Sequence, residues 1–105
     1  MTSEQAQITI EQLGGTRALH LMTGAHTFVY GEDRGVSFKF KGSDKANYVQ
    51  IRLKHDTYSM QFMKLRRYEA ETVAQFEGVY VDMLQELFEE TTGLTLSVPR
   101  IAFAG

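Results

Sequence analysis

Acid–base and metal chemistry in proteins depends mostly on histidine, cysteine and paired carboxylates, and this sequence offers few of them at useful spacing. The three histidines, His20, His26 and His55, stand in different segments and form no HxH, HxxxH or HExxH pattern. The chain has no cysteine, which excludes a disulfide framework, an iron–sulfur cluster, thiolate zinc and a cysteine nucleophile. Glycine patterns for nucleotide phosphates and the G-x-S-x-G motif are also missing. The sequence therefore predicts a protein without catalysis, metal or cofactor.

A basic ribbon is the first candidate for binding. In residues 38–54 apolar and cationic side chains alternate along two predicted strands, so the cations would project from one side of a hairpin. A cationic sheet surface attracts phosphate backbones, but exposed charges also solvate a sheet and protect its edges. Tyr48, Tyr58 and Tyr68 are the rings that could stack on bases, and the sequence leaves their direction open. The candidate nucleic-acid residues are Lys39, Lys41, Arg52, Lys54, Lys64 and Arg66.

An acidic helix and an apolar tail form the second candidate. Carboxylates recur on one side of the predicted C-terminal helix, where they either present an anionic surface to a basic partner protein or only solvate the helix. Two acids in the last turn oppose the helix dipole, and such a departure from local rules favours a functional role. The tail after Pro99 could fold back on the core or add to a partner. The predicted protein-binding residues are Asp82, Glu86, Glu89, Glu90, Ile101 and Phe103.

Length and composition are typical of one small globular domain. The 105 residues are 43% hydrophobic and 23% charged. Residues 36–67 hold eight basic and two acidic side chains, a net +6, whereas residues 68–105 hold one and seven, a net −6. Opposite patches on one chain also favour self-association, so a homo-oligomer is compatible with the sequence. Without a membrane-length apolar run or a signal peptide, we expect a cytoplasmic protein with no membrane partner.

The N-terminal part is expected to be short and irregular. Residues 1–7 are interpreted as a loose leader, followed by a short helical turn in which Thr9 and Gln12 form a capping box. Two glycines end that turn, and the pattern then changes from helical to strand-like. Alternation predicts the first strand over residues 17–22, and further strands separated by turns follow it.

The C-terminal part predicts one long amphipathic helix. Its acidic residues occupy one side, and Gly93 is placed to cap its end. Residues 99–105 are expected to form a flexible tail of the single domain 1–105. Together these patterns predict an α+β fold: a five- or six-stranded antiparallel meander with the helix packed on one face. The predicted apolar face of the helix is Tyr80, Met83, Leu84, Leu87 and Phe88.

Three stretches carry a resemblance to a known group: "LGGTRALHLMTGAHTFVY", "NYVQIRL" and "GVYVDMLQELFEETTGL". From about Ile8 to Leu94, the chain resembles small uncharacterised proteins encoded by bacteriophages and prophages. The resemblance implies a mobile-element origin and the cytoplasm of a bacterial host cell, and it carries over no functional residue. Short phage accessory proteins often act by binding macromolecules, which is an analogy at the level of the group.

These observations predict a small phage-type accessory protein that binds a macromolecular partner without catalysis. A protein partner, such as a component of host defence that the chain inhibits, is the first choice. Nucleic-acid binding through the basic ribbon is the alternative, and a small structural or self-assembling phage protein is the third hypothesis.

Overall fold

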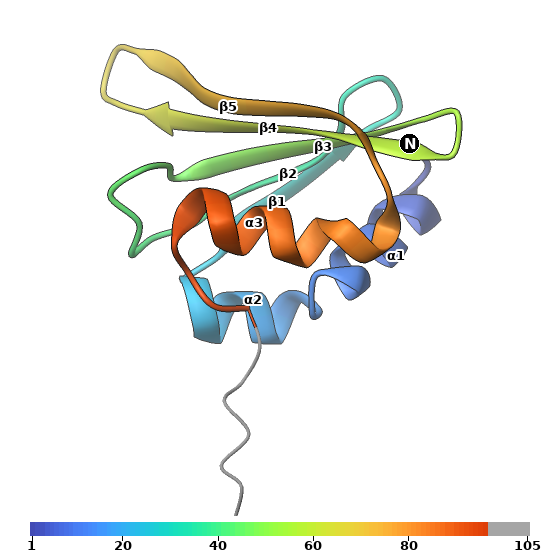
Figure 1. Cartoon of the computed structure of the whole chain (residues 1–105), viewed down its shortest axis with the longest axis horizontal. Helices are drawn as coiled ribbons and strands as arrows, with labels where there is room; N and C mark the ends of the chain where they lie inside the picture. The colour runs from blue at the N-terminus through green and yellow to red at the C-terminus, as the bar shows by residue number, and fades with distance from the viewer. Residues whose placement is uncertain (97–105) are drawn as a thin grey trace, which may run out of the picture.

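The computed structural model of the chain describes residues 1–96. Within that range five antiparallel strands form one sheet in the order β1-β2-β3-β4-β5, so each strand pairs with its neighbour in sequence. The helices lie on one side of this sheet (Figure 1). The prediction of an α+β fold with an antiparallel meander of five or six strands is confirmed, with five strands. The elements are α1 (Ser3–Gln12), α2 (Thr16–Thr23), β1 (His26–Gly31), β2 (Gly35–Lys39), β3 (Tyr48–Lys54), β4 (Thr57–Leu65), β5 (Ala70–Val79), η1 (Val81–Met83) and α3 (Leu84–Thr92).

The core lies between the helices and the side chains that alternate toward them. Phe38 of β2 is opposite Val49 of β3, which is opposite Phe62 of β4, and all three are fully buried. The ring of Phe88 on α3 packs onto this row, with centroid distances of 5.1 Å to Phe40 and 5.9 Å to Phe62. The apolar side of the predicted basic ribbon is therefore confirmed as the core face of the sheet.

The C-terminal helix is shorter than the sequence suggested. After β5 the chain is extended at Tyr80, forms the 3-10 turn η1, and then enters the nine-residue α3. Tyr80 and Met83 are consequently exposed, at 62% and 37%, and the prediction that they belong to the buried face is wrong. The helix ends at Gly93 in the left-handed conformation, as predicted. The buried stripe, spaced at every fourth residue, is Leu84, Phe88 and Thr92.

Helix α1 begins at Ser3, so the prediction of a loose leader is wrong. Thr2 caps the helix, because its hydroxyl accepts from the Gln5 N–H at 3.1 Å while the Gln5 side chain accepts from the Thr2 N–H at 2.9 Å. The predicted capping residue, Thr9, is buried within the helix instead, and its hydroxyl donates to the Gln5 carbonyl at 2.8 Å. Because its hydroxyl is hydrogen-bonded, Thr9 can be buried in the apolar stripe of α1. A polar residue at that position interrupts the hydrophobic pattern, so the sequence alone did not indicate the stripe. The rest of the stripe is Ala6, Ile10 and Leu13.

Residues 17–22, which alternation predicted to be a strand, lie in helix α2. Leu19 is fully buried whereas Leu21 is 68% exposed, so the two leucines do not share a face as they would in a strand. The helix is favoured because Leu19 and Thr23, four residues apart, both face the core, and the Thr23 hydroxyl donates to the Leu19 carbonyl at 2.6 Å. Gly24 then ends the helix in the left-handed conformation.

The packing of α3 is tested by truncating two of its leucines. Leu84 is fully buried, so Leu84→Ala is expected to lower the free energy of unfolding by about 2–5 kcal/mol through the cavity it leaves. Leu87 is only partly buried, so Leu87→Ala is expected to destabilise the protein less. Urea denaturation of both variants measures the difference. A larger loss for Leu87→Ala would contradict the orientation of α3.

Two glycines test the contact between β2 and β3. At Gly35, with φ of +73°, an added Cβ would meet the Ile51 carbonyl oxygen at 1.9 Å, whereas Gly78, with φ of +63°, has nothing within 4 Å of its Cβ position. Both alanine variants incur a conformational cost of about 1–2 kcal/mol, and only Gly35→Ala must also displace a strand. We expect Gly78→Ala to melt about 5–15 °C lower. Gly35→Ala is expected to lose its cooperative thermal transition in circular dichroism, and equal melting of the two variants would contradict the β2–β3 contact.

Candidate nucleic-acid interface

Within residues 1–96, no helix covers the face of the sheet turned away from α1, α2 and α3 (Figure 1). We call this surface the open face. Strand alternation places Lys39 opposite Tyr48 and Arg52 opposite Ser59 on it. Most of its other residues can form hydrogen bonds, so the surface is polar and cationic. They include Ser37, Gln50, Gln61 and Gln75.

A hollow of about 550 Å³ lies on the open face over β1, β2 and β3. Small residues such as Gly35 and Ser37 leave this depression between longer side chains. None of the residues that line it, all within the described part of the chain, is acidic. The three cations that line it are Arg34, Lys39 and Arg52. This cationic hollow therefore carries a local positive charge, although the whole chain has a net charge of −2.

A hydrogen bond and a bulge shape the cationic hollow. The Gln50 side chain reaches across β2 and donates to the Arg34 carbonyl at 2.8 Å, which ties the β1–β2 turn to β3. In β1, Thr27 and Phe28 together face the single residue Phe38, which is the geometry of a β-bulge. Thr27 has φ of +57°, a conformation that β-branched residues rarely adopt, and it lines the hollow. The bulge lets Phe28 pack on the core, with its ring centroid 5.1 Å from that of Phe38.

A second hollow of about 370 Å³ adjoins the first at Lys39, which lines both. Lys41 and Arg66 are the other cations along it. Asn47 positions this end of the sheet, since its side chain donates to the Leu65 carbonyl at 2.8 Å and accepts from the Leu65 N–H at 2.7 Å. The two hollows form a cationic track from Arg34 and Arg52 to Lys41 and Arg66.

The six predicted cations are distributed unequally. Lys39, Lys41, Arg52 and Arg66 lie along the track described above. Lys54 lies in a further depression, which Arg52 also lines at the end of the track and which contains acidic side chains: Glu32, Asp33 and Glu77. Lys64 lies on the opposite side of β4 from the open-face residues, and its ammonium donates to the Asp44 carbonyl at 3.2 Å. Lys54 and Lys64 are therefore in mixed or separate surroundings.

Sequence reasoning did not identify Arg34, Gln50 or Asn47 as site residues. Arg34 stands in a glycine-bounded stretch typical of a turn and Gln50 at a polar position of an alternating strand pattern, and neither type of position carries a sequence signal for binding. Their contribution depends on the β2–β3 register, which brings the Gln50 side chain to the Arg34 carbonyl. Asn47, placed just before β3, is a residue type that often bonds to nearby backbone, and this was the one available signal.

The register also decides where the tyrosines lie. Tyr48 is on the open face opposite Lys39 and lines the cationic hollow. Tyr58 is buried in the core, where the Thr9 hydroxyl lies 3.4 Å from its own. Tyr68 is 90% exposed in the β4–β5 turn, with the Arg67 guanidinium 6.0 Å from its ring centroid. Two of the three rings thus accompany cations, as base-stacking surfaces require.

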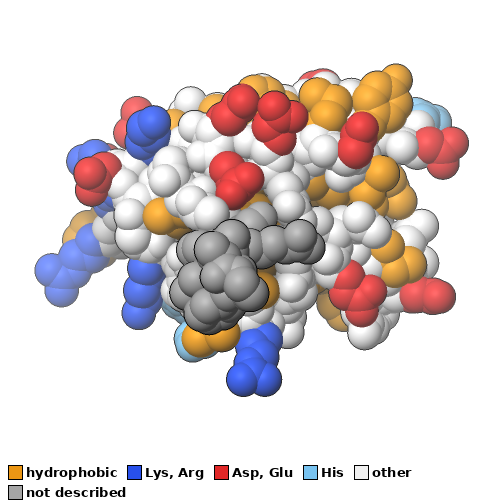
Figure 2. All heavy atoms as spheres, turned by 60° about the horizontal axis from the view of Figure 1, so that its bottom comes forward, with side chains coloured by type: hydrophobic (Ala, Val, Ile, Leu, Met, Phe, Trp, Pro, Cys, Tyr) orange, Lys and Arg blue, Asp and Glu red, His pale blue; other side chains and the backbone are white. Residues whose placement is uncertain are grey.

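The predicted acidic site is placed on η1 and α3. Asp82 and Glu86 lie in the first turns of these helices, where a negative charge is favourable, and Glu90 is exposed in the last turn. Glu89 has a structural partner, because its carboxylate accepts from the Leu96 N–H at 2.9 Å. Figure 2, which shows the helical side, has acidic side chains spread over much of that surface and most Lys and Arg at one end. The other predicted protein-binding residues, Ile101 and Phe103, lie outside the described residues.

Other kinds of site receive no support within residues 1–96. No group of three or more His, Asp or Glu side chains there is arranged to hold a metal ion. No helix in that part of the chain is long and apolar enough to cross a membrane. Comparisons with protein-family models, curated proteins and solved structures found no match to this chain. The phage-like origin therefore remains a hypothesis from the sequence resemblance alone.

The hydrogen bond between Glu89 and the Leu96 N–H predicts that Glu89 contributes to stability, whereas an exposed acid in the last turn of a helix is expected to contribute nothing. Glu89→Ala removes the acceptor of the Leu96 N–H and is expected to destabilise the protein by about 0.5–1.5 kcal/mol. Glu90→Ala, the matched control one residue away, removes an exposed acid that opposes the helix dipole and is expected to be neutral or slightly stabilising. Urea denaturation compares the two. Equal stability of both variants would mean that Glu89 contributes no capping.

Proposed function

We propose that this chain binds single-stranded nucleic acid through the open face of its sheet. The observation that carries the proposal is the placement of Tyr48 directly opposite Lys39, inside a hollow lined by cations and by no acidic residue of the described chain. Sheet surfaces that bind single strands combine these two elements, aromatic rings for the bases and cations for the phosphates. This support raises nucleic-acid binding above the acidic-helix hypothesis that the sequence favoured.

The spacing of the groups suits an extended strand. Arg52 follows Tyr48 by four residues on the same face of β3, which corresponds to about 13 Å along the strand. Lys39 lies beside the ring, and Lys41 and Arg66 continue the track past it. A single strand lying along this track would place one base on Tyr48 and phosphates on the cations to either side. Ser37 and Gln50 line the hollow and provide hydrogen-bonding groups for base edges.

The proposal predicts salt-dependent binding of a fluorescent oligo(dT) of about 16 nucleotides. Binding should be measurable at low salt and weaken with a log–log slope of about 0.7 per phosphate contacted. The variant Lys39→Ser/Lys41→Ser/Arg52→Ser is expected to reduce affinity at least tenfold and to lower the slope. The control Arg17→Ser/Lys45→Ser/Lys64→Ser removes the same charge elsewhere and is expected to have a much smaller effect. Equal losses in both triple variants, or no binding by the unaltered chain, would refute the open-face proposal.

Stacking is tested separately from charge by Tyr48→Ala. Base–aromatic stacking contributes about 1–3 kcal/mol per base, so affinity is expected to fall about fivefold or more while the salt slope stays unchanged. Tyr80→Ala serves as the control, because Tyr80 is an exposed ring just before η1 and lines neither hollow of the cationic track. Fluorescence anisotropy at several salt concentrations measures both quantities. If Tyr48→Ala binds as tightly as Tyr80→Ala, the ring does not contact the strand.

A second candidate function is the binding of a basic partner protein, such as a component of host defence, by η1 and α3. Its support is the exposure of Val81 and Met83, at 47% and 37%, beside the acidic residues Asp82 and Glu86. Exposed apolar side chains next to complementary charge are features of protein interfaces. Capture of proteins from bacterial lysate, with and without nuclease, distinguishes this function from nucleic-acid binding. The captured partner should be lost in the variant Asp82→Asn/Glu86→Gln and should survive nuclease.

A further inference from the structure

The two edges of the sheet are protected to different degrees. The outer edge of β5 carries Glu71 and Glu77 and is interrupted by two irregularities in its pairing with β4. Charges and bulges of this kind prevent a strand edge from pairing with another chain. The other edge strand, β1, has one bulge near its start and then runs through residues 28–31 without a charged side chain. In that stretch Val29 and Tyr30 are 56% and 52% exposed.

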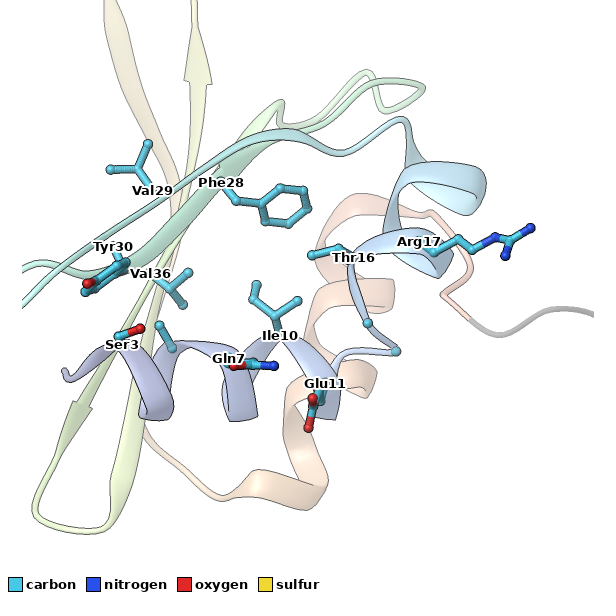
Figure 3. A pocket seen from close by; sticks show the side chains of 13 residues that line it. Ser3, Gln7, Ile10, Glu11, Thr16, Arg17, Phe28, Val29, Tyr30 and Val36 are labelled. Carbon is cyan, nitrogen blue, oxygen red and sulfur yellow. The ribbon is translucent and has the colours of Figure 1, made fainter.

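An apolar slot of about 540 Å³ lies beside this edge, between β1 and α1 (Figure 3). Its apolar lining comes from Ile10 on α1 and from Phe28 and Val36 on the two strands. Figure 3 shows these side chains directed into the slot, with Tyr30 at one end of it and Val29 directed to the opposite side of the strand. The same edge thus combines unpaired backbone with an uncovered apolar surface.

We propose that β1 pairs antiparallel with β1 of a second copy of this chain, on a two-fold axis at Val29. In that register Val29 is opposite Val29 of the second copy, and Phe28 is opposite Tyr30. Phe28 and Tyr30 both lie on the slot side of β1, since they alternate with Val29. Each Tyr30 would therefore cover the slot of the other copy. A two-fold contact of this kind closes on itself and leaves no free complementary edge.

The charges at the two ends of β1 also favour a second copy of this chain as the partner of this edge. Glu32 and Asp33 follow the strand and outnumber the one cation of the same turn, Arg34, whereas Lys39 lies opposite His26 at the start of the strand. Lys41 is close to the same end, where its N–H donates to the Thr23 carbonyl at 2.8 Å. Antiparallel pairing brings the acidic end of one copy to the basic end of the other, twice. A parallel arrangement would instead place like charges together, so the antiparallel dimer is the complementary one.

The dimer extends the proposed nucleic-acid surface and to that extent rests on the proposed function. A two-fold axis perpendicular to the sheet leaves both open faces on the same side. Val29 lines the cationic hollow, so the two hollows would meet at the axis. One single strand could then cross both copies, and binding would strengthen dimer formation.

A cysteine-free chain allows a direct test by site-specific cross-linking. Opposed residues of an antiparallel pair have Cα atoms about 4.5–5.5 Å apart, within the range of a disulfide. Val29→Cys is expected to form a covalent dimer under mild oxidation at micromolar concentration. Val73→Cys, at the exposed valine of the β5 edge, is the matched control and is expected to remain mostly monomeric. Equal cross-linking of the two variants would overturn the proposal.

Analytical ultracentrifugation provides the second measurement. The unaltered chain is expected to sediment at twice the mass of one chain, Val29→Lys at the monomer mass, and Val73→Lys at the dimer mass. A monomeric unaltered chain at high micromolar concentration, or dissociation by Val73→Lys alone, would overturn the dimer. Tyr48→Ala separates the two proposals, because Tyr48 lies on β3 and the change leaves the β1 edge and its charges unaltered. This variant is expected to remain dimeric by sedimentation even where nucleic-acid binding weakens.

Discussion

The packing of Phe88 against the aromatic row of the sheet is the interaction on which the rest of this structure depends. Its ring packs on the rings of Phe38 and Phe62, which come from β2 and β4, so one side chain of a short helix joins separate strands to the helical layer. Together with α1 and α2, this places the helices on a single side of the sheet. Five strands then have one buried and one uncovered face, and the uncovered face holds many of the polar residues of β2, β3 and β4.

The shape and charge of the uncovered face depend on the register between strands, on a β-bulge and on one side-chain hydrogen bond. Pairing of β2 with β3 brings Lys39 to Tyr48, while the bulge at Thr27 and the Gln50–Arg34 hydrogen bond shape a hollow from a surface that is otherwise flat. A β-branched residue in the left-handed region is unfavourable in isolation, and it persists here because the surrounding strands determine it. The strand pairing that builds the core on one face of the sheet therefore also shapes the candidate site on the other face.

The acidic residues of η1 and α3 and the cations of the open face support two different proposed interactions. Four of the thirteen acidic residues lie on η1 and α3, and two of these, Glu86 and Glu89, have structural explanations in the helix dipole and in the Leu96 N–H. The cations of β2 and β3, by comparison, have no acidic neighbour among the residues that line the cationic hollow. Of these cations, Arg52 also lines a neighbouring depression that contains acidic side chains. Charges already used by the fold are weaker candidates for binding than charges that the fold gathers in one hollow, which is why the open face is the better-supported site.

The sequence by itself determined the β2–β3 hairpin, its apolar and basic sides, and the cap of α3 at Gly93, because strand alternation and glycine caps are local properties. It did not determine that α1 starts at Ser3 or that residues 17–22 are helical. In both segments buried threonines, Thr9 and Thr23, satisfy their hydroxyls within the helix, and a polar residue then interrupts the apolar period. The direction of Tyr48 and the contact between Gln50 and Arg34 were decided only by tertiary structure, since both follow from the register between strands, which no single strand encodes.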